Sequence, residues 1–300
     1  MRKRGWAVLT AVVALSLLAS ACGSDKTSSS SGQSNTTSGP TTTKPTFAAG
    51  TTMANLQAKG KIVVGTKFDQ PGLGQKNPST GKVEGFDVEI AKLIAQGIFG
   101  GSLSDAESKI EFKESTTPNR ETFIQNGTVD IVVATYTIND ARKQLVDFAG
   151  PYYVAGQDIM VKANDNSIKG VSDLNGKKTC SVRNSTPAAN VRRLAPQADL
   201  TEFDQYSDCV QALRDGRVQS VTTDNSILLG FVAGSPTDFK IVGNKFTDEP
   251  YGIGLKKGDT ELQTKINDAI TKMDESVVGF PLNLTDADVK VVKADELFVR

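Results

Sequence analysis

The stretch GTVDIVVATYTINDARK, residues 127–143, decides the fold of this chain. After a helix-ending glycine, the β-branched residues 131–133 predict a buried strand over residues 129–135. A short helix is expected to follow at once, because Asn139 or Thr137 is a suitable N-cap residue. The stretch is therefore a strand that runs directly into a helix.

Polar side chains gather where this strand ends. Thr135 and Thr137 supply hydroxyl groups, and Arg142 follows on the helix. The carboxyl ends of strands are where open α/β sheets bind ligands. Because a guanidinium group pairs with a carboxylate through two parallel hydrogen bonds, the pattern predicts a carboxylate ligand. A lone helix arginine is usually a surface residue, but its place after the strand end favours a binding role for Arg142.

Strand-like and helical runs alternate from residue 61 to residue 135, and the alternation restarts after Gly156. This pattern is typical of βα units on a mainly parallel sheet and predicts an α/β fold.

The two halves also echo each other. In each half a helix is expected to end at a glycine, Gly127 or Gly216, and a strand begins two residues later. The echo aligns Thr135 with Asp224 at the ends of equivalent strands. Two lobes with these ends facing each other would enclose a cleft.

Three further motifs appear in order: GFDVE at 85–89, DFAGPYY at 147–153 and EPYGIG at 249–254. Together with residues 127–143 they resemble the polar amino-acid-binding proteins of bacterial ABC importers. The resemblance covers nearly all of residues 61–274 and is greatest for the glutamate/aspartate-binding branch.

The resemblance implies a two-lobed periplasmic-binding-protein fold, in which each lobe is a mainly parallel sheet flanked by helices and two strands form the hinge. Lobe 1 would comprise residues 51–155 and 250–300, and lobe 2 residues 156–249. The hinge crossings would lie near residues 152–158 and 248–251.

The resemblance also implies the ligand contacts. Arg142 would hold the α-carboxylate of an amino acid, with added bonds from Thr135 and Thr137. Asp224 would hold the α-ammonium group, since a desolvated cation needs a fixed anion. Asp224 is also a candidate N-cap for a helix over residues 225–233, and both roles can hold together.

Substrate choice would depend on the segment TTPNR, residues 116–120, which opens a helix. By resemblance, the Asn119–Arg120 pair reaches the side-chain carboxylate of glutamate, and Lys67 adds another basic group. Thr117 of the same segment is a further candidate ligand contact. Glutamate is the expected ligand, while aspartate and glutamine remain open.

In the second lobe, VRNST at residues 182–186 matches a ligand-contacting turn at a helix start. It makes Arg183 and Thr186 candidate contacts, although Ser185 replaces the usual glycine. Tyr206 falls where some relatives have a ligand-contacting histidine. Pro187 is a further departure from the pattern.

The N-terminus has the features of a secretory signal. Three basic residues precede an apolar run that is too short to span a bilayer and that ends in small residues before Cys22. We expect residues 1–21 to be the signal peptide and Cys22 to carry a lipid, with ordinary cleavage and a free Cys22 as the alternative. Residues 22–50, rich in Ser and Thr, are expected to form a flexible linker.

The charge balance argues against nucleic-acid binding. The chain has 34 basic and 34 acidic residues, and loss of the signal leaves a net charge of −3. Beyond Cys22, two cysteines remain, Cys180 and Cys209, on a predicted strand and the helix after the next strand. In an oxidising compartment a disulfide is expected, worth roughly 3–4 kcal/mol for a loop of about 30 residues. Two buried thiols are the alternative.

No metal site is expected, because the two cysteines are far apart in sequence and the chain has no histidine. The absence of histidine also argues against acid–base catalysis, and we expect no catalytic residues and no cofactor. The expected protein is a monomeric, extracytoplasmic lipoprotein that delivers its ligand to an ABC permease. A dehydratase-like enzyme on the same fold is the alternative, and a fused sensor is disfavoured because no spanning segment follows the domain.

Overall fold

The computed structural model describes residues 43–273 of the 300-residue chain. The predictions of a signal peptide over residues 1–21 and of lipidation at Cys22 lie outside the described residues. So do most of the predicted linker and residues 274–300 of the predicted first lobe.

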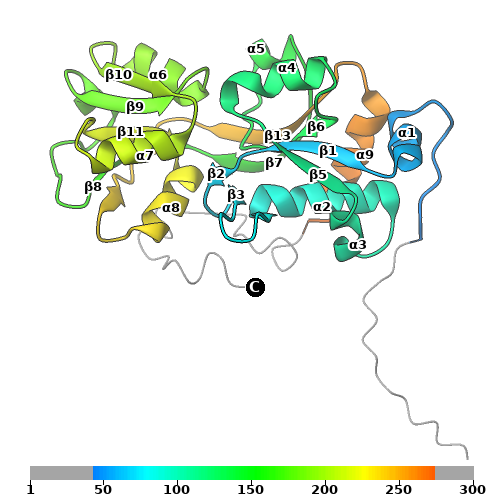
Figure 1. Cartoon of the computed structure of the whole chain (residues 1–300). Helices are drawn as coiled ribbons and strands as arrows, with labels where there is room; N and C mark the ends of the chain where they lie inside the picture. Colours follow the sequence, from blue (N-terminus) through cyan, green and yellow to red (C-terminus); the bar gives the residue numbers. More distant parts are fainter. Residues whose placement is uncertain (1–42, 274–300) are drawn as a thin grey trace, which may run out of the picture. The chain divides into compact units, whose positions relative to one another are not determined.

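The first sheet has the strand order β5-β1-β6-β13-β7 (Figure 1). Its strands are β1 (Ile62–Thr66), β5 (Ile110–Glu114), β6 (Ile131–Val132), β7 (Asp147–Ala155) and β13 (Glu249–Leu255). Beside them lie α1 (Thr52–Lys59), α2 (Phe86–Phe99), α3 (Leu103–Glu107), η1 (Thr117–Asn119), α4 (Arg120–Gln125), α5 (Asp140–Lys143) and α9 (Thr260–Ile270). Strands β5, β1 and β6 are parallel, whereas β13 is antiparallel to both β6 and β7.

The second sheet repeats this plan with the order β10-β9-β11-β8-β12. Its strands are β8 (Gln157–Lys162), β9 (Lys178–Val182), β10 (Asp199–Phe203), β11 (Ser220–Asp224) and β12 (Phe239–Ile241). The associated helices are η2 (Val171–Leu174), α6 (Thr186–Leu194), α7 (Tyr206–Arg214) and α8 (Asn225–Gly234). Strands β10, β9 and β11 are parallel, and β8 is antiparallel to β11 and β12.

The predicted α/β fold with two lobes is confirmed, and the internal echo is real. Strands β6 and β11 hold the same third place in their sheets. The helices before them end at Gly127 and Gly216, whose φ angles of 73° and 75° are left-handed. Each sheet is mainly parallel, as expected, because only β13 in the first sheet and β8 in the second run against the other four strands.

Strands β7, β8 and β13 carry the chain between the two sheets. Strand β7 belongs to the first sheet and β8 to the second, and only Gly156 separates them. The return crossing enters β13, which pairs with β7 from Glu249 to Leu255. Both crossings lie within the predicted hinge segments.

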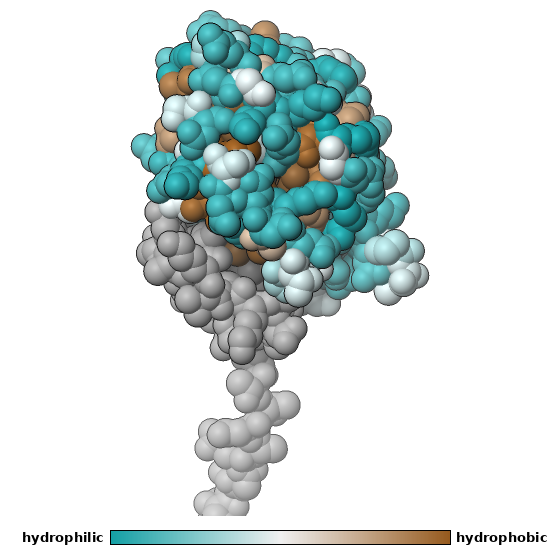
Figure 2. Space-filling model, turned by 90° about the vertical axis from the view of Figure 1, so that its left-hand side faces the viewer, coloured by the Kyte–Doolittle hydropathy of each residue, from teal (hydrophilic) through white to brown (hydrophobic). Residues whose placement is uncertain are grey.

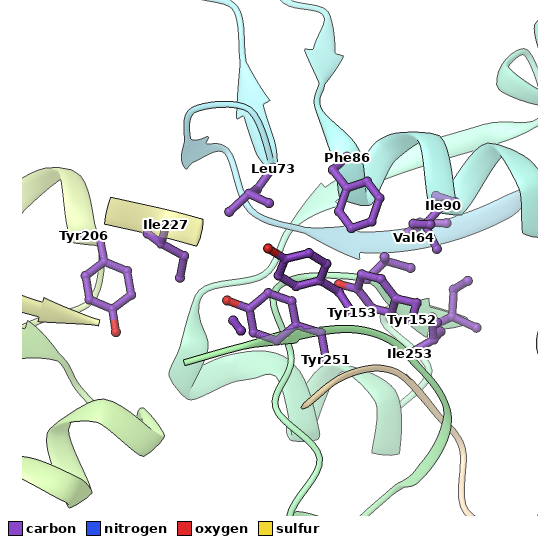
Figure 3. Packing of buried hydrophobic residues seen from close by; sticks show 14 of the residues in the cluster. Val64, Leu73, Phe86, Ile90, Tyr152, Tyr153, Tyr206, Ile227, Tyr251 and Ile253 are labelled. Carbon is purple, nitrogen blue, oxygen red and sulfur yellow. The ribbon is translucent and has the colours of Figure 1, made fainter. Parts of the chain in front are cut away.

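Aromatic rings fill the space beside these crossings. Phe86 of α2 packs against Tyr152 and Tyr153 of β7, with ring centroids 5.7 and 5.8 Å apart. Tyr251 of β13 lies 5.7 Å from Tyr153 (Figure 3). The hinge strands are thus anchored to the core of the first lobe.

The small sheet β2 (Asp69–Gln70), β3 (Gly74–Lys76) and β4 (Val83–Glu84) was not expected from the sequence. It is built of antiparallel strands of two or three residues, too short to leave a recognisable alternation.

The chain already contacts the first lobe before residue 50, inside the segment predicted as linker. The carbonyl of Pro45 accepts a hydrogen bond of 2.8 Å from Gln57 of α1, and Phe47 packs against the core. Gly100 leaves no room for a side chain, because a Cβ there would lie 2.7 Å from the Cα of Lys44. The packed part of the chain therefore begins earlier than Gly50.

Cys180 of β9 and Cys209 of α7 are joined as a disulfide, with Cα atoms 5.5 Å apart. Both residues are fully buried. We expect neither thiol to react with an alkylating agent in the unfolded, unreduced mature protein, and both to react after reduction. Peptide mapping by mass spectrometry measures this, and alkylation of the pair before reduction would show that the thiols are free.

Hydrophilic residues cover most of the face of the second lobe, with small apolar areas between them (Figure 2). Within residues 43–273, no helix has the length and apolar character needed to cross a membrane.

Candidate functional site

The segment after β6 leaves the sheet but stays buried. The predicted strand over residues 129–135 is shorter in the structure, because only Ile131–Val132 pair in the ladder. Thr135 has a φ of 45°, which turns the chain out of the strand. Its backbone N–H donates to Asp87 Oδ2 at 2.9 Å, so the turn is held by a carboxylate from α2.

Asp87 explains the GFDVE motif. Gly85 has a φ of 123°, and a Cβ there would lie 2.5 Å from the carbonyl oxygen of Leu73, so glycine is required. Asp87 in the first turn of α2 also accepts the hydroxyl hydrogen of Tyr152 at 2.6 Å. Burial raises the pKa of Asp87 to about 6, against the opposing effect of these hydrogen bonds. The motif thus ties the end of β6 to hinge strand β7.

Two arginines lie against one tyrosine ring beyond this turn. The guanidinium carbon of Arg120 is 4.1 Å from the centroid of Tyr136, and that of Arg142 is 5.0 Å from it. Arg120 Nη1 donates to the carbonyl of Ala134 at 3.0 Å, and Arg142 Nη1 donates to that of Thr137 at 2.7 Å. Backbone carbonyls and one aromatic face therefore hold both cations in place.

Arg142 is positioned by the predicted helix start. Asn139 caps α5, and its side-chain oxygen accepts the backbone N–H of Arg142 at 2.9 Å. Arg142 Nε lies 3.5 Å from Glu121 Oε1. Burial, followed by the charge of Arg120, lowers the pKa of Arg142 to about 10.

Lys67 is a third buried cation of the first lobe. It lies just after β1, and its Nζ donates to Thr117 Oγ1 at 2.8 Å. Burial, with the nearby charges of Arg120 and Arg142, lowers the pKa of Lys67 to about 7, although Asp69 and Asp87 act in the opposite direction.

The second lobe contributes a buried carboxylate. Asp224 is the N-cap residue of α8, as predicted, but its side chain makes no capping hydrogen bond. Instead Asp224 Oδ2 accepts the hydroxyl hydrogen of Tyr251 at 2.7 Å, because β13 passes beside it. Burial, and then the charge of Glu249, raise the pKa of Asp224 to about 8.

These groups surround a single pocket between the two sheets. It is lined by Thr117, Arg120, Thr135, Thr137, Arg142, Ser185, Thr186, Pro187, Tyr206, Thr223, Asp224 and Ile227. Its empty volume is about 240 Å³. Eight of the ten residues predicted to bind ligand line it.

The other two predicted residues lie elsewhere. Lys67 is one contact away, through Thr117. Arg183 is exposed at the turn after β9, where it pairs with Asp204 and donates to the carbonyl of Glu202 at 3.2 Å. Its side chain extends along β10 rather than into the pocket, so its position gives no support to the prediction that it contacts ligand.

Two residues that matter for the site were not singled out from the sequence. Ser185 caps α6 by accepting the N–H of Ala188 at 3.0 Å, and it also lines the pocket. Glu249 is buried at the hinge, and its Oε2 accepts the hydroxyl hydrogen of Thr186 at 2.7 Å. The motif at residues 249–254 begins with Glu249 and could have indicated it.

Three buried polar atoms of the residues that line the pocket have no hydrogen-bond partner within residues 43–273. They are Arg120 Nε, Thr223 Oγ1 and Asp224 Oδ1. A cation from one lobe and an anion from the other therefore keep unused hydrogen-bonding capacity, and a zwitterionic ligand can use both. No cluster of three potential metal ligands occurs in this part of the chain.

Comparisons with known proteins agree with this geometry. Residues 62–277 match the family model of bacterial extracellular solute-binding proteins, family 3. The ABC transporter glutamine-binding protein GlnH of Bacillus subtilis is 44% identical over 223 residues, which cover 74% of this chain and 79% of that protein. The glutamate-binding protein GluB of Corynebacterium glutamicum is 44% identical over 220 residues, covering 71% of this chain and 74% of that protein.

A solved structure is also similar. An ancestral arginine-binding protein bound to glutamine superposes with a TM-score of 0.66 at 37% identity, covering 77% of this chain and 96% of that one.

Proposed function

Since this chain belongs to the bacterial extracellular solute-binding proteins of family 3, we propose that it captures glutamate between its two lobes. The observation that carries the proposal is the separation of charge across the pocket. Arg120 and Arg142 line it from the first lobe, and Asp224 lines it from the second. An amino acid presents the complementary pair, a carboxylate and an ammonium group.

Arg142 is the proposed partner of the α-carboxylate. It follows the end of β6, and its guanidinium group is fixed by Thr137 and by the ring of Tyr136. Every amino acid carries an α-carboxylate, so this contact does not discriminate between side chains. Thr135 and Thr137 can add hydroxyl or backbone bonds to the same group.

Asp224 is the proposed partner of the α-ammonium group. Its Oδ1 is buried and without a partner among the described residues, while Oδ2 is fixed by Tyr251. Ionising Asp224 in this buried place is costly, as its raised pKa shows, unless a cation reaches it. The ligand's ammonium group would supply that cation.

Arg120 is the proposed partner of the side-chain carboxylate, with Lys67 behind it. A second and a third buried cation exceed what one α-carboxylate requires, which favours an acidic ligand. Glutamine is the second candidate, because Lys67, with a pKa of about 7, can become neutral and GlnH is as similar to this chain as GluB.

We further propose that lipidation at Cys22 holds the protein at the outer face of the membrane, and that it delivers its ligand to an ABC permease. The similarity to an ABC transporter protein supports this role. A dehydratase-like enzyme is less favoured, since the chain has no histidine to act as a general acid or base.

A thermal-shift screen against the standard amino acids tests the proposal. A ligand that binds only the native state stabilises it by about 2.7 kcal/mol at a hundredfold excess over its dissociation constant. We expect the largest shift with glutamate and smaller shifts with aspartate and glutamine. The absence of a shift with every amino acid would remove the binding proposal, and a larger shift with glutamine would remove only the acidic assignment.

The pH dependence should distinguish the two ligands. Below pH 8 Asp224 is mostly protonated in the closed, empty pocket, so binding an ammonium group must release its proton, and affinity rises with pH towards 8. The titration of Lys67 has the opposite effect on glutamate affinity, which it lowers as the pH rises. Above pH 7 Lys67 must take up a proton before it can pair with a carboxylate.

We therefore expect glutamine binding to release about one proton at pH 7, and glutamate binding to release less. Calorimetry in buffers of different ionisation enthalpy measures this number. In the wild-type protein the release should fall as the pH is raised above 8, where Asp224 is already ionised, whereas release of glutamine-linked protons that persists undiminished at higher pH would assign the titration to another group.

A further inference from the structure

The two lobes also touch outside the pocket, where α8 of the second lobe meets the turn between β2 and β3 of the first. Leu73 from this turn and Ile227 from α8 approach each other in Figure 3. Gly230, one helical turn after Ile227, lies against Pro71. A Cβ on Gly230 would be 2.1 Å from the carbonyl oxygen of Pro71 and 3.3 Å from its Cβ.

The surrounding contacts show that this is where the lobes close on each other. The backbone N–H of Ser207, in the first turn of α7, donates to Asp69 Oδ2 of β2 at 3.2 Å. Gln205 Nε2 donates to Glu114 Oε1 at the end of β5. At Gly230 the neighbouring atom is a backbone carbonyl oxygen, which cannot move aside as a flexible side chain can.

Helix α8 connects this contact to the pocket. The helix begins directly after Asp224, and Ile227 in its first turn lines the pocket. Residues three apart on a helix lie on the same face, so Ile227 and Gly230 both face the first lobe. The depth at which Gly230 seats on Pro71 therefore sets how far Asp224 and Ile227 approach the first lobe's cations.

We propose that Gly230 is a positioning residue for ligand capture: the missing side chain lets α8 seat on Pro71 and brings Asp224 to the ligand. This inference rests on the proposed amino-acid binding. Gly230 is not among the residues that line the pocket, so it acts through the closed arrangement rather than by contact with the ligand.

A methyl group at position 230 should penalise only the closed arrangement. Pro71 and Gly230 belong to different lobes, so opening the cleft separates them and removes the clash. Within α8 itself alanine is a better helix former than glycine. The cost of overpacking typically corresponds to a loss of about 10- to 100-fold in affinity.

The same helix offers a matched control. Gly234 ends α8, and a Cβ there would meet nothing within 4 Å. Gly230→Ala and Gly234→Ala therefore make the same chemical change one helical turn apart, with and without the contact to Pro71.

Calorimetry with glutamate on the purified wild-type protein and both variants tests the inference, together with the ligand-free melting temperature and small-angle scattering with and without ligand. We expect Gly230→Ala to bind about 10- to 100-fold more weakly, to melt no lower than wild type without ligand, and to compact less on saturation. Gly234→Ala should match wild type in affinity and compaction.

The outcomes separate the two proposals. Wild-type affinity and compaction in Gly230→Ala would overturn the inference and leave amino-acid binding intact. A lower ligand-free melting temperature in Gly230→Ala would also overturn it, because the glycine would then be needed for folding. If wild type binds no amino acid, both proposals fall.

Discussion

Arg142→Ala is expected to abolish detectable binding of both glutamate and glutamine. Removing one partner of a buried, hydrogen-bonded charge pair typically costs about 2–5 kcal/mol, which is well over tenfold in affinity. Arg142 is buried, and its guanidinium group is preorganised by the carbonyl of Thr137 and the ring of Tyr136. Because every amino acid needs the α-carboxylate contact, the loss should not depend on the side chain.

Lys143→Ala is a suitable control for this variant. Lys143 follows Arg142 on the same short helix, and its side chain is exposed and pairs with Asp140. Calorimetry should give wild-type affinity for Lys143→Ala and no measurable heat for Arg142→Ala. Retained binding of either ligand by Arg142→Ala would show that the α-carboxylate is held by another group.

Arg120→Ala is expected to weaken glutamate binding strongly and glutamine binding much less. If Arg120 pairs with the side-chain carboxylate, glutamate loses a charge-assisted contact, and about 2–5 kcal/mol with it. An amide forms a weaker bond to the same group and loses less.

The structure shows why the ratio of the two affinities is the quantity to measure. Arg120 also donates to the carbonyls of Ala134 and Thr135, so its removal loosens the strand end for any ligand. That common loss cancels in the ratio of glutamate to glutamine affinity. An unchanged ratio in Arg120→Ala would refute the acidic assignment without affecting amino-acid binding as such.

The charges of the pocket also suggest why ligand and closure go together. On one side Arg120 and Arg142 repel each other across Tyr136, and on the other the charge of Glu249 disfavours ionised Asp224. A ligand with two carboxylates and one ammonium group relieves both repulsions, but only when the lobes are close enough to share it. Binding would then shift an open–closed equilibrium towards the closed form.

Local signals in the sequence determined much of the fold. The helix expected after Asn139 is α5, with Asn139 as its N-cap, and the helix expected over residues 225–233 agrees with α8 to within one residue. Gly127 and Gly216 end their helices with left-handed φ angles, as their positions predicted. Thr135 and Asp224, which the sequence echo aligned with each other, both line one pocket.

Tertiary structure decided the features that depend on residues distant in the chain. Strand β6 is short because the backbone N–H of Thr135 donates to Asp87, 48 residues earlier, instead of to a neighbouring strand. No sequence pattern near residue 135 indicates this partner. Asp224 is the N-cap residue of α8, but its side chain bonds to Tyr251 rather than to the helix, since β13 returns beside it. The side chain of Arg183 likewise follows a residue distant in the chain, because it donates a hydrogen bond to the carbonyl of Glu202 in the neighbouring strand β10.

The contact between the two lobes at Gly230 was not apparent from the sequence either. Gly230 lies in a strongly apolar helix, and nothing nearby in the sequence explains why a glycine stands there. The explanation is the carbonyl oxygen of Pro71 in the other lobe, which leaves no room for a Cβ atom. A sequence pattern records which face of an element is buried, whereas the packing of one lobe on another depends on where the whole chain has placed both surfaces.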